Sequence, residues 1–360
     1  MAERGSSGEA AEEIVRSITS FALYGFPESH AASFALLAYA SAYLKAHHPA
    51  AFACALLNNW PMGFYHPATI VKDAQRHGVR VLPIDVTRSH WRCTLERVQP
   101  DGRLCLRLGL RFVSGLRSEA GEHLVRERQR APFRSLEEVA QRCPLRQEEL
   151  QRLAEIGAFA ALGYTRRSAL WQVAGIARGP LFHSRLPREG ELSPRESLSP
   201  HYHAGASSPL TDMSAWERTL SDYRGTGLTV GPHLLAHLRT ALAAEGVLPA
   251  VQLARLPHGQ WVELAGCVIV RQRPGTAKGF CFLTLEDETG LANVVITPAL
   301  FERYRALIHT APLLRVAGPL QKVDGVVHVR ALRLVPLALP SITALHQRGR
   351  GYRMRLTPED

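Results

Sequence analysis

Residues 24–45, which read YGFPESHAASFALLAYASAYLK, predict a tight turn that leads into a long helix. Gly25 permits a positive φ, and Pro27 fixes its own φ and has no N–H group to donate. Ser29 is typical of a helix N-cap, and good helix formers follow it without a break. We therefore expect a helix that starts at Ser29 and runs to Lys45.

The predicted helix carries apolar residues at helical spacing, so we expect one of its faces to be buried. These residues are Phe34, Leu37, Ala38 and Ala42. His30 would lie in the first turn, where free backbone N–H groups and the positive end of the helix dipole favour an anion such as a phosphate. A buried amphipathic helix with a hydrogen-bonded histidine is the alternative interpretation.

Three short segments in this part of the chain resemble the C-family bacterial DNA polymerases, the DnaE type related to the polymerase III α subunit. They are YGFPESH at 24–30, LKAHHPAAF at 44–52 and NWPMGFY at 59–65. The PESH and PMGFY forms are similar to the error-prone paralogue rather than to the main replicative enzyme. The resemblance continues in the same order to about Leu337, and therefore covers nearly the whole chain.

The resemblance implies that residues 24–30 belong to the fingers, beside the incoming deoxynucleoside triphosphate. The nucleotide-binding residues that it implies are Tyr24, Gly25, Phe26, Ser29 and His30. It also places the sugar of the nucleotide near His30, so that this side chain would help to exclude ribonucleotides. The implied function is the C-terminal, DNA- and nucleotide-contacting portion of an error-prone DNA polymerase used in damage-associated, translesion synthesis.

In that family, templated nucleotidyl transfer uses two magnesium ions held by aspartates of the palm. No acidic pair on alternating strand positions precedes residue 24, so we expect the chain to lack the palm and to be inactive alone. We expect no catalytic residue, metal site or cofactor in this chain, and magnesium only with the palm. A non-catalytic DNA-binding module from a truncated or split gene is the alternative, and an RNA-binding accessory protein is a weaker one.

The composition agrees with a nucleic-acid partner. The chain has 43 Lys and Arg residues against 32 Asp and Glu residues, a net charge of +11. A basic globular chain favours an anionic partner, of which nucleic acid comes first. Its six cysteines form no Cys-x-x-Cys pair and are typical of buried thiols in a reducing compartment. With neither a signal peptide nor a membrane-spanning run, the expected location is the cytoplasm.

The resemblance and the sequence pattern predict a multidomain chain. Mainly helical parts, the remainder of the fingers and a tandem helix-hairpin-helix, are followed by a C-terminal β-barrel, an OB-fold. The expected parts are a disordered N-terminus at 1–13, the fingers at 14–107, the helix-hairpin-helix pair at 108–175, a linker at 176–208, a helical connector at 209–255, the OB-fold at 256–337 and a basic tail at 338–360. Within the fingers, residues 79–86 alternate like a strand, and residues 91–96 and 105–108 predict a hairpin around Asp101.

The helix-hairpin-helix prediction rests on two glycine turns, at Gly115 and at Gly157, each between short helices. Amides in such turns grip a phosphate without reading a base. Arg117 replaces the second glycine of the usual Gly-hydrophobic-Gly pattern, and could contact a phosphate itself. Arg166 and Arg167 are the pair that we most expect at a DNA backbone. Ordinary helical packing is the alternative interpretation of both turns.

The OB-fold prediction rests on five strand candidates with one helix between the third and the fourth. They are residues 261–270, 280–285, 291–296, 313–318 and 326–331, with the helix at 298–309. OB-folds bind single strands by stacking and through a basic groove. The expected DNA contacts are Arg271, Arg273, Lys278 and Phe280, with Phe282 on the same strand face. Packing of both phenylalanines in the core is the alternative.

The expected partners are DNA, as primer-template and single-stranded template, and a deoxynucleoside triphosphate. Other replication or mutasome proteins are further candidates, and no membrane partner is expected.

Overall fold

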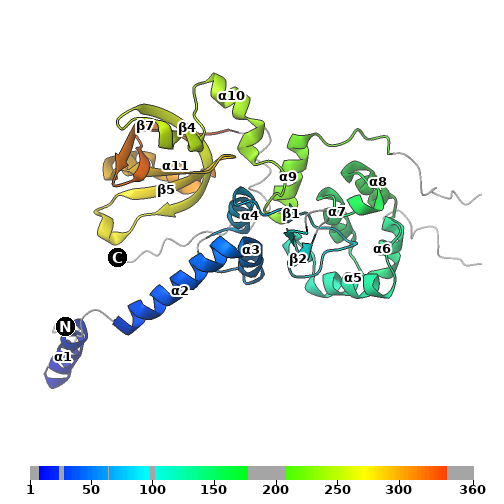
Figure 1. Ribbon diagram of the computed structural model, residues 1–360, viewed down its shortest axis with the longest axis horizontal. Helices are drawn as coiled ribbons and strands as arrows, with labels where there is room; N and C mark the ends of the chain where they lie inside the picture. The colour runs from blue at the N-terminus through cyan, green and yellow to red at the C-terminus, as the bar shows by residue number, and fades with distance from the viewer. Residues whose placement is uncertain (1–7, 24–27, 64, 98–101, 177–207, 339–360) are drawn as a thin grey trace, which may run out of the picture. The chain divides into compact units, whose positions relative to one another are not determined.

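The computed structural model describes residues 8–23, 28–63, 65–97, 102–176 and 208–338 (Figure 1). The chain forms two compact units, Met1–Phe52 and Ala53–Asp360. The expected linker and tail, at 176–208 and 338–360, lie almost wholly outside the described residues, and so does most of the expected disordered N-terminus. Among the described residues, no helix is long and apolar enough to cross a membrane.

The first unit contains helices α1 (Glu9–Leu23) and α2 (Glu28–His47). The long helix is therefore present, but it begins at Glu28, so Ser29 lies in its first turn and is not the N-cap. The expectation that one face of this helix is buried is wrong, because no described residue of α2 is buried. Phe34 and Leu37 are 58% and 60% exposed. Apolar residues lie on every side of α2, so its pattern defines no single stripe for a core.

The second unit begins within α3 (Pro49–Asn58) and continues with α4 (Pro67–Arg76) and a three-stranded sheet. Its strands are β1 (Val81–Leu82), β2 (Thr94–Arg97) and β3 (Leu104–Arg107), in the order β1-β3-β2. The expected β2–β3 hairpin is confirmed as an antiparallel pair, although Asp101 itself lies outside the described residues. The expected strand at 79–86 is shorter, because Pro83 has no N–H group for a ladder and Asp85 starts a turn closed by Ser89.

Short helices follow this sheet and enclose a common core. They are η2 (Leu110–Phe112), α5 (Ser118–Arg130), α6 (Leu136–Arg142), α7 (Gln147–Glu155), η3 (Ala160–Leu162) and α8 (Arg166–Ile176). Leu124, Leu153 and Phe159 are each at most 1% exposed in this part of the unit. After residue 208 come α9 (Ala215–Thr226), η4 (Leu234–His237), α10 (Arg239–Ala244) and η5 (Ala250–Arg255), in the residues expected to form a helical connector.

The C-terminal part is a sheet domain, drawn in yellow to red in Figure 1. Its elements are β4 (Trp261–Gln272), η6 (Gly275–Ala277), β5 (Cys281–Glu286), β6 (Leu291–Ile296), α11 (Pro298–Thr310), β7 (Leu313–Val323), β8 (Val326–Arg330) and β9 (Arg333–Pro336). The five expected strands and the helix are confirmed, and β9 is an addition. The strand order is β4-β5-β6-β8-β7-β9, and β4 also pairs with β7, so the pairing is continuous around the domain. Among the strand pairs that the structure describes in this domain, β6 and β8 are parallel and the others are antiparallel.

Candidate nucleic-acid interface

The first hairpin turn is open to solvent. Gly115 has φ +82°, and a Cβ atom placed there would meet nothing within 4 Å. The turn leads into α5, whose N-cap residue, Arg117, makes no side-chain bond to the cap. Arg117 therefore does not cap the first N–H groups of α5. A backbone phosphate can bind at a helix N-terminus only where such N–H groups are not capped by a side chain.

Arg117 itself is committed to Glu149 on α7. Its Nε and Nη2 atoms each donate to the Glu149 carboxylate at 2.9 Å, and its backbone N–H donates to the same group at 3.0 Å. Burial alone would raise the pKa of Glu149, but the bonds from Arg117 and from the Arg146 N–H lower it to about 2. The guanidinium of Arg117 therefore ties the first hairpin to the second. A direct phosphate contact by Arg117 stays a prediction.

The second hairpin turn is covered by the arginine that was expected at a DNA backbone. Gly157 has φ +78°, and a Cβ atom there would lie 3.0 Å from Arg166 Nε. Arg166 pairs with Asp222 of α9 at 2.7 Å, and Arg167 pairs with Glu217 at 2.9 Å. The two arginines thus join α8 to α9, and their contact with a DNA backbone stays a prediction.

Helix α9 approaches the hairpins closely because it carries a glycine. A Cβ atom on Gly225 would lie 2.2 Å from Cγ2 of Ile156. The carbonyl of Gly225 also accepts a hydrogen bond of 2.7 Å from the N–H of Ser114, in the first hairpin turn. The connector beyond the linker therefore packs against both hairpins.

The outer surface of the sheet domain presents a row of residues across four strands. Gln272 of β4 lies opposite Phe282 of β5, Phe282 lies opposite Val295 of β6, and Val295 lies opposite Arg330 of β8. Residues opposite each other in a sheet share a face. The neighbours of Phe282 along β5 are buried, whereas Phe282 is 37% exposed, so this row faces outward.

A second, parallel row carries hydrogen-bonding side chains. It consists of Thr284, Asn293, His328 and Gln321, which lie opposite one another from β5 to β7. His328 Nε2 lies 2.9 Å from Gln321 Oε1. Together the two rows form one face with an aromatic ring, an apolar side chain, an arginine and amide groups. We call these eight residues the outer face.

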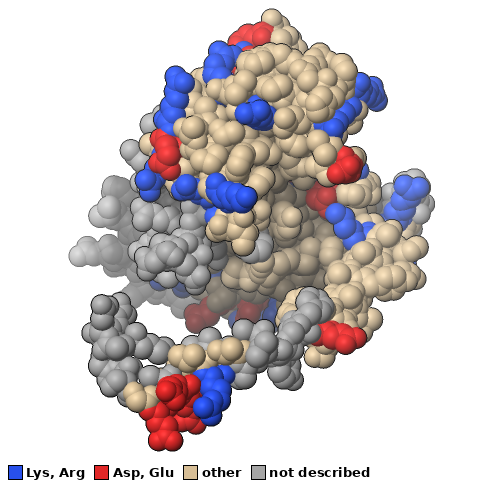
Figure 2. All heavy atoms as spheres, turned by 90° about the vertical axis from the view of Figure 1, so that its left-hand side faces the viewer, with Lys and Arg blue, Asp and Glu red and all other residues tan. Residues whose placement is uncertain are grey.

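Lys278 and Phe280 border the outer face, on the segment that leads into β5. Lys278 is exposed in the left-handed region, with φ 48°, and Phe280 is 36% exposed. The alternative interpretation, that Phe280 and Phe282 pack in the core, is therefore wrong. Figure 2 shows one side of the sheet domain in its upper part, with Lys and Arg side chains spaced around residues of other types.

The other two expected contacts of this domain have structural partners. Arg271 donates to the carbonyls of Ile308 and Ala311, at the C-terminal end of α11, at 2.7 and 2.5 Å. Arg273 lies over the ring of Phe301, with its guanidinium carbon 4.2 Å from the centroid. Arg271 thus stabilises the end of a helix, which its sequence position did not indicate.

The expected contacts did not include Val295, Arg330 or the residues of the second row. Their strands were recognised, and residues that alternate with buried ones along a strand must face outward. The missing information was the register, which brings β6 and β8 beside Phe282.

Of the expected nucleotide-binding residues, Tyr24, Gly25 and Phe26 lie outside the described residues. Ser29 and His30 are exposed in the first turn of α2, and the His30 ring lies 4.5 Å from that of Phe34. In the part of the chain that the structure describes, no three His, Cys, Asp or Glu side chains gather as a metal ion would require.

Comparison with known proteins agrees with the helical part of this description. Residues 78–169 match the family model of a helix-hairpin-helix motif. The error-prone DNA polymerase of Anaeromyxobacter sp. (strain K) is 45% identical over 357 residues, which cover 97% of this chain and 30% of that protein. The error-prone DNA polymerase of Azoarcus sp. (strain BH72) is 46% identical over 98% of this chain and 32% of its own length.

The chain is a relative of part of the error-prone DNA polymerases. Agreement over nearly its whole length confirms the resemblance to the error-prone paralogue of the C-family enzymes. The chain spans about a third of the length of these polymerases, as it also does of the one from Pseudomonas fluorescens (34%). The helix-hairpin-helix prediction is confirmed by the family model, which includes the turns at Gly115 and Gly157.

Proposed function

We propose that this chain is a DNA-contacting part of an error-prone DNA polymerase and that it binds both duplex and single-stranded DNA. The outer face carries this proposal. It combines an exposed phenylalanine with an arginine and amide side chains, and aromatic stacking beside positive charge is how proteins bind single strands without reading sequence. The first hairpin turn, which leads into the N-terminus of α5, is the matching site for a duplex backbone.

We propose further that the sheet domain is an OB-fold. Its support is the continuous pairing of β4, β5, β6, β8 and β7, with α11 between β6 and β7 along the chain, the third and fourth strands in sequence order. In OB-folds the face of the second and third strands binds oligonucleotides. Here these are β5 and β6, which carry Phe282 and Val295.

In a complete polymerase this part would act in damage-associated, translesion synthesis, in the cytoplasm, with magnesium held elsewhere in the enzyme. We propose that residues 24–30 then lie beside the deoxynucleoside triphosphate and that His30 packs under the 2′ position of its sugar. The exposure of His30 in the first turn of α2 supports this role. A His30→Ala polymerase should insert ribonucleotides more often relative to deoxynucleotides, and an unchanged ratio would contradict the role.

The test of the proposed function is fluorescence anisotropy with labelled DNA. We expect the chain to bind a single-stranded oligonucleotide and a blunt duplex of mixed sequence, each with little dependence on base order. Phe282→Ala should weaken only single-strand binding. If the chain binds neither DNA at low salt, or if it binds only one base sequence, the proposal fails.

A further inference from the structure

An acidic turn joins β5 to β6 and is held by residues from far away in the chain. Its carboxylates belong to Glu286, Asp287 and Glu288, and the first two residues are only 3% and 2% exposed. Buried carboxylates destabilise a fold unless charges or hydrogen bonds compensate for their lost hydration. The partners of these carboxylates therefore show which segments the turn binds.

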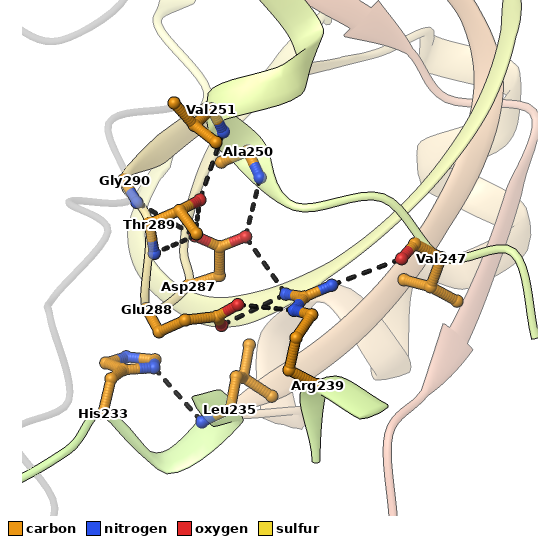
Figure 3. A network of polar contacts seen from close by, with 10 residues as sticks. All are labelled: His233, Leu235, Arg239, Val247, Ala250, Val251, Asp287, Glu288, Thr289 and Gly290. Atoms are coloured by element: carbon orange, nitrogen blue, oxygen red, sulfur yellow. Dashed lines mark hydrogen bonds and ion pairs between the residues drawn. The ribbon is translucent and has the colours of Figure 1, made fainter. Parts of the chain in front are cut away.

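Two of the carboxylates fix the turn to the connector (Figure 3). Asp287 accepts hydrogen bonds from the N–H groups of Thr289, Gly290 and Ala250, at 2.7, 2.9 and 2.7 Å. Arg239 of α10 donates to Asp287 at 3.3 Å, and it also forms an ion pair with Glu288. The contacts of Ala250 and Arg239 span 37 to 49 residues of the chain and attach the turn to the connector.

The third carboxylate reaches the other side of the linker. Glu286 Oε1 accepts from Nη2 of Arg76, on α4, at 2.6 Å. Burial raises the pKa of Glu286, and the hydrogen bond and charge of Arg76 act against this rise. Since 210 residues separate the two along the chain, this ion pair is a tertiary contact between α4 and the sheet domain.

Two more side chains of α4 bind the connector, in the segment between α9 and η4. Lys72 Nζ donates to the carbonyl of Gly231 at 2.6 Å, and Gln75 Nε2 donates to the carbonyl of Val230 at 2.8 Å. Residues three and four apart share one face of a helix, so Lys72, Gln75 and Arg76 form a single polar edge. We call these three residues of α4, with Glu286, Gly231 and Val230, the joint.

The joint lies at the end of β5 and close to the start of β6, two of the strands that carry the outer face. Phe282 is on β5, which ends at Glu286, and Val295 is on β6, which starts after the acidic turn. The position of α4 is in turn tied to the hairpins, because Asp222 of α9 binds both Arg166 and the hydroxyl of Thr229, two residues before Gly231.

We propose that the Arg76–Glu286 pair is a coupling contact that holds the outer face in a fixed relation to the hairpins, so that one DNA molecule with a duplex and a single-stranded part engages both. This inference rests on the proposed function. Two sites on one rigid body bind a two-part ligand more tightly than either part, because the second contact is intramolecular. Arg76 and Glu286 are proposed as positioning residues, because they pair with each other and act through the packing of α4 on the sheet domain.

The test compares three labelled DNAs by anisotropy: a blunt duplex, a single strand, and a duplex with a single-stranded 5′ overhang. The wild-type chain should bind the overhang DNA at least about tenfold more tightly than either part. In Arg76→Ala most of this gain should be lost, while the dissociation constants for the duplex and the single strand change less than about twofold. Arg88→Ala is the matched control, because it removes an arginine that pairs with Glu96 in the three-stranded sheet.

Two further variants separate coupling from misfolding. The exchange Arg76→Glu with Glu286→Arg should restore part of the gain, and Gln75→Ala should reduce it without a change of charge. A thermal melt of each variant checks folding. The coupling is contradicted if Arg76→Ala keeps the full gain or loses affinity equally for all three DNAs. It is also contradicted if the wild-type chain shows no gain. If wild type binds neither the duplex nor the single strand, the proposed function itself fails.

Discussion

Arg117 and Glu149 join the two hairpins through a charged pair in which the carboxylate is 3% exposed and accepts two bonds of 2.9 Å from one guanidinium. Glu149 also accepts a hydrogen bond of 2.7 Å from the N–H of Arg146, the N-cap residue of α7. The pair therefore stabilises the relation between the hairpins, with α5 on one side and α7 on the other.

Glu149→Gln should destabilise the chain by about 1–3 kcal/mol at neutral pH, because it removes the charge from these bonds. The pKa of Glu149 is lowered from 4.5 to about 2, so its contribution is complete above about pH 4.5 and is lost as the pH falls through 2. Urea unfolding of both proteins at pH 7 and pH 3 measures this. The difference should shrink at pH 3, and an equal difference at both values would contradict the role of the charge.

Gly225→Ala should destabilise the packing of α9 on α7 by about 1–3 kcal/mol, because the new methyl group meets Ile156 at 2.2 Å. Gly175→Ala in α8 is the control, since its Cβ atom meets nothing within 4 Å. That change should leave stability unchanged or raise it by about 0.5 kcal/mol. Thermal unfolding compares the two variants, and equal melting temperatures would show that α9 does not need the glycine.

Much of the architecture follows from local pattern. Alternation and turn residues predict the strands of the sheet domain, and the helix expected at 298–309 is present as α11 (Pro298–Thr310). The pattern fails where the outcome depends on contacts that are distant in sequence. Arg166 and Arg167 resemble a DNA-binding pair along the chain, yet their partners are Asp222 and Glu217 beyond the linker.

The candidate site was predictable only in part for the same reason. Phe280 was selected from its place in the expected strand at 280–285, whereas Arg330 becomes part of the outer face only through the parallel pairing of β6 with β8. Likewise, α2 has the composition of a buried helix, but composition cannot say what covers it. Strand register and packing partners depend on tertiary structure and cannot be derived from one sequence.

Phe282→Ala should weaken single-strand binding by about 1–3 kcal/mol, or roughly 5- to 150-fold, because one base loses its stacking partner. Trp261→Ala is the control. It removes a larger aromatic side chain, 58% exposed, from the end of β4 that pairs with β7, away from Phe282. Anisotropy with an oligonucleotide of thymidines measures both. Equal loss in the two variants would mean that Phe282 has no special part in binding.

A specific protease site inserted between residues 176 and 208 should allow the chain to be cut without separation of its halves. The contacts of Arg166, Gly225 and Arg76 hold the residues on either side of the cut together. Gel filtration after cleavage should show one peak that contains both halves. Two separate peaks at low salt would contradict the packing of α9 and the joint. Cleavage of a chain that also carries Arg76→Ala and Gly225→Ala is the control in which separation is expected.

The dependence of DNA binding on salt tests the central claim most directly. A chain with a net charge of +11 that neutralises several phosphates releases their counterions, so its affinity must fall as salt rises. We expect the dissociation constant for a duplex with a single-stranded overhang to rise at least about tenfold between about 50 and about 200 mM NaCl. Affinity that is absent at the lower concentration, or unchanged at the higher one, would contradict the assignment of this chain as a DNA-contacting part.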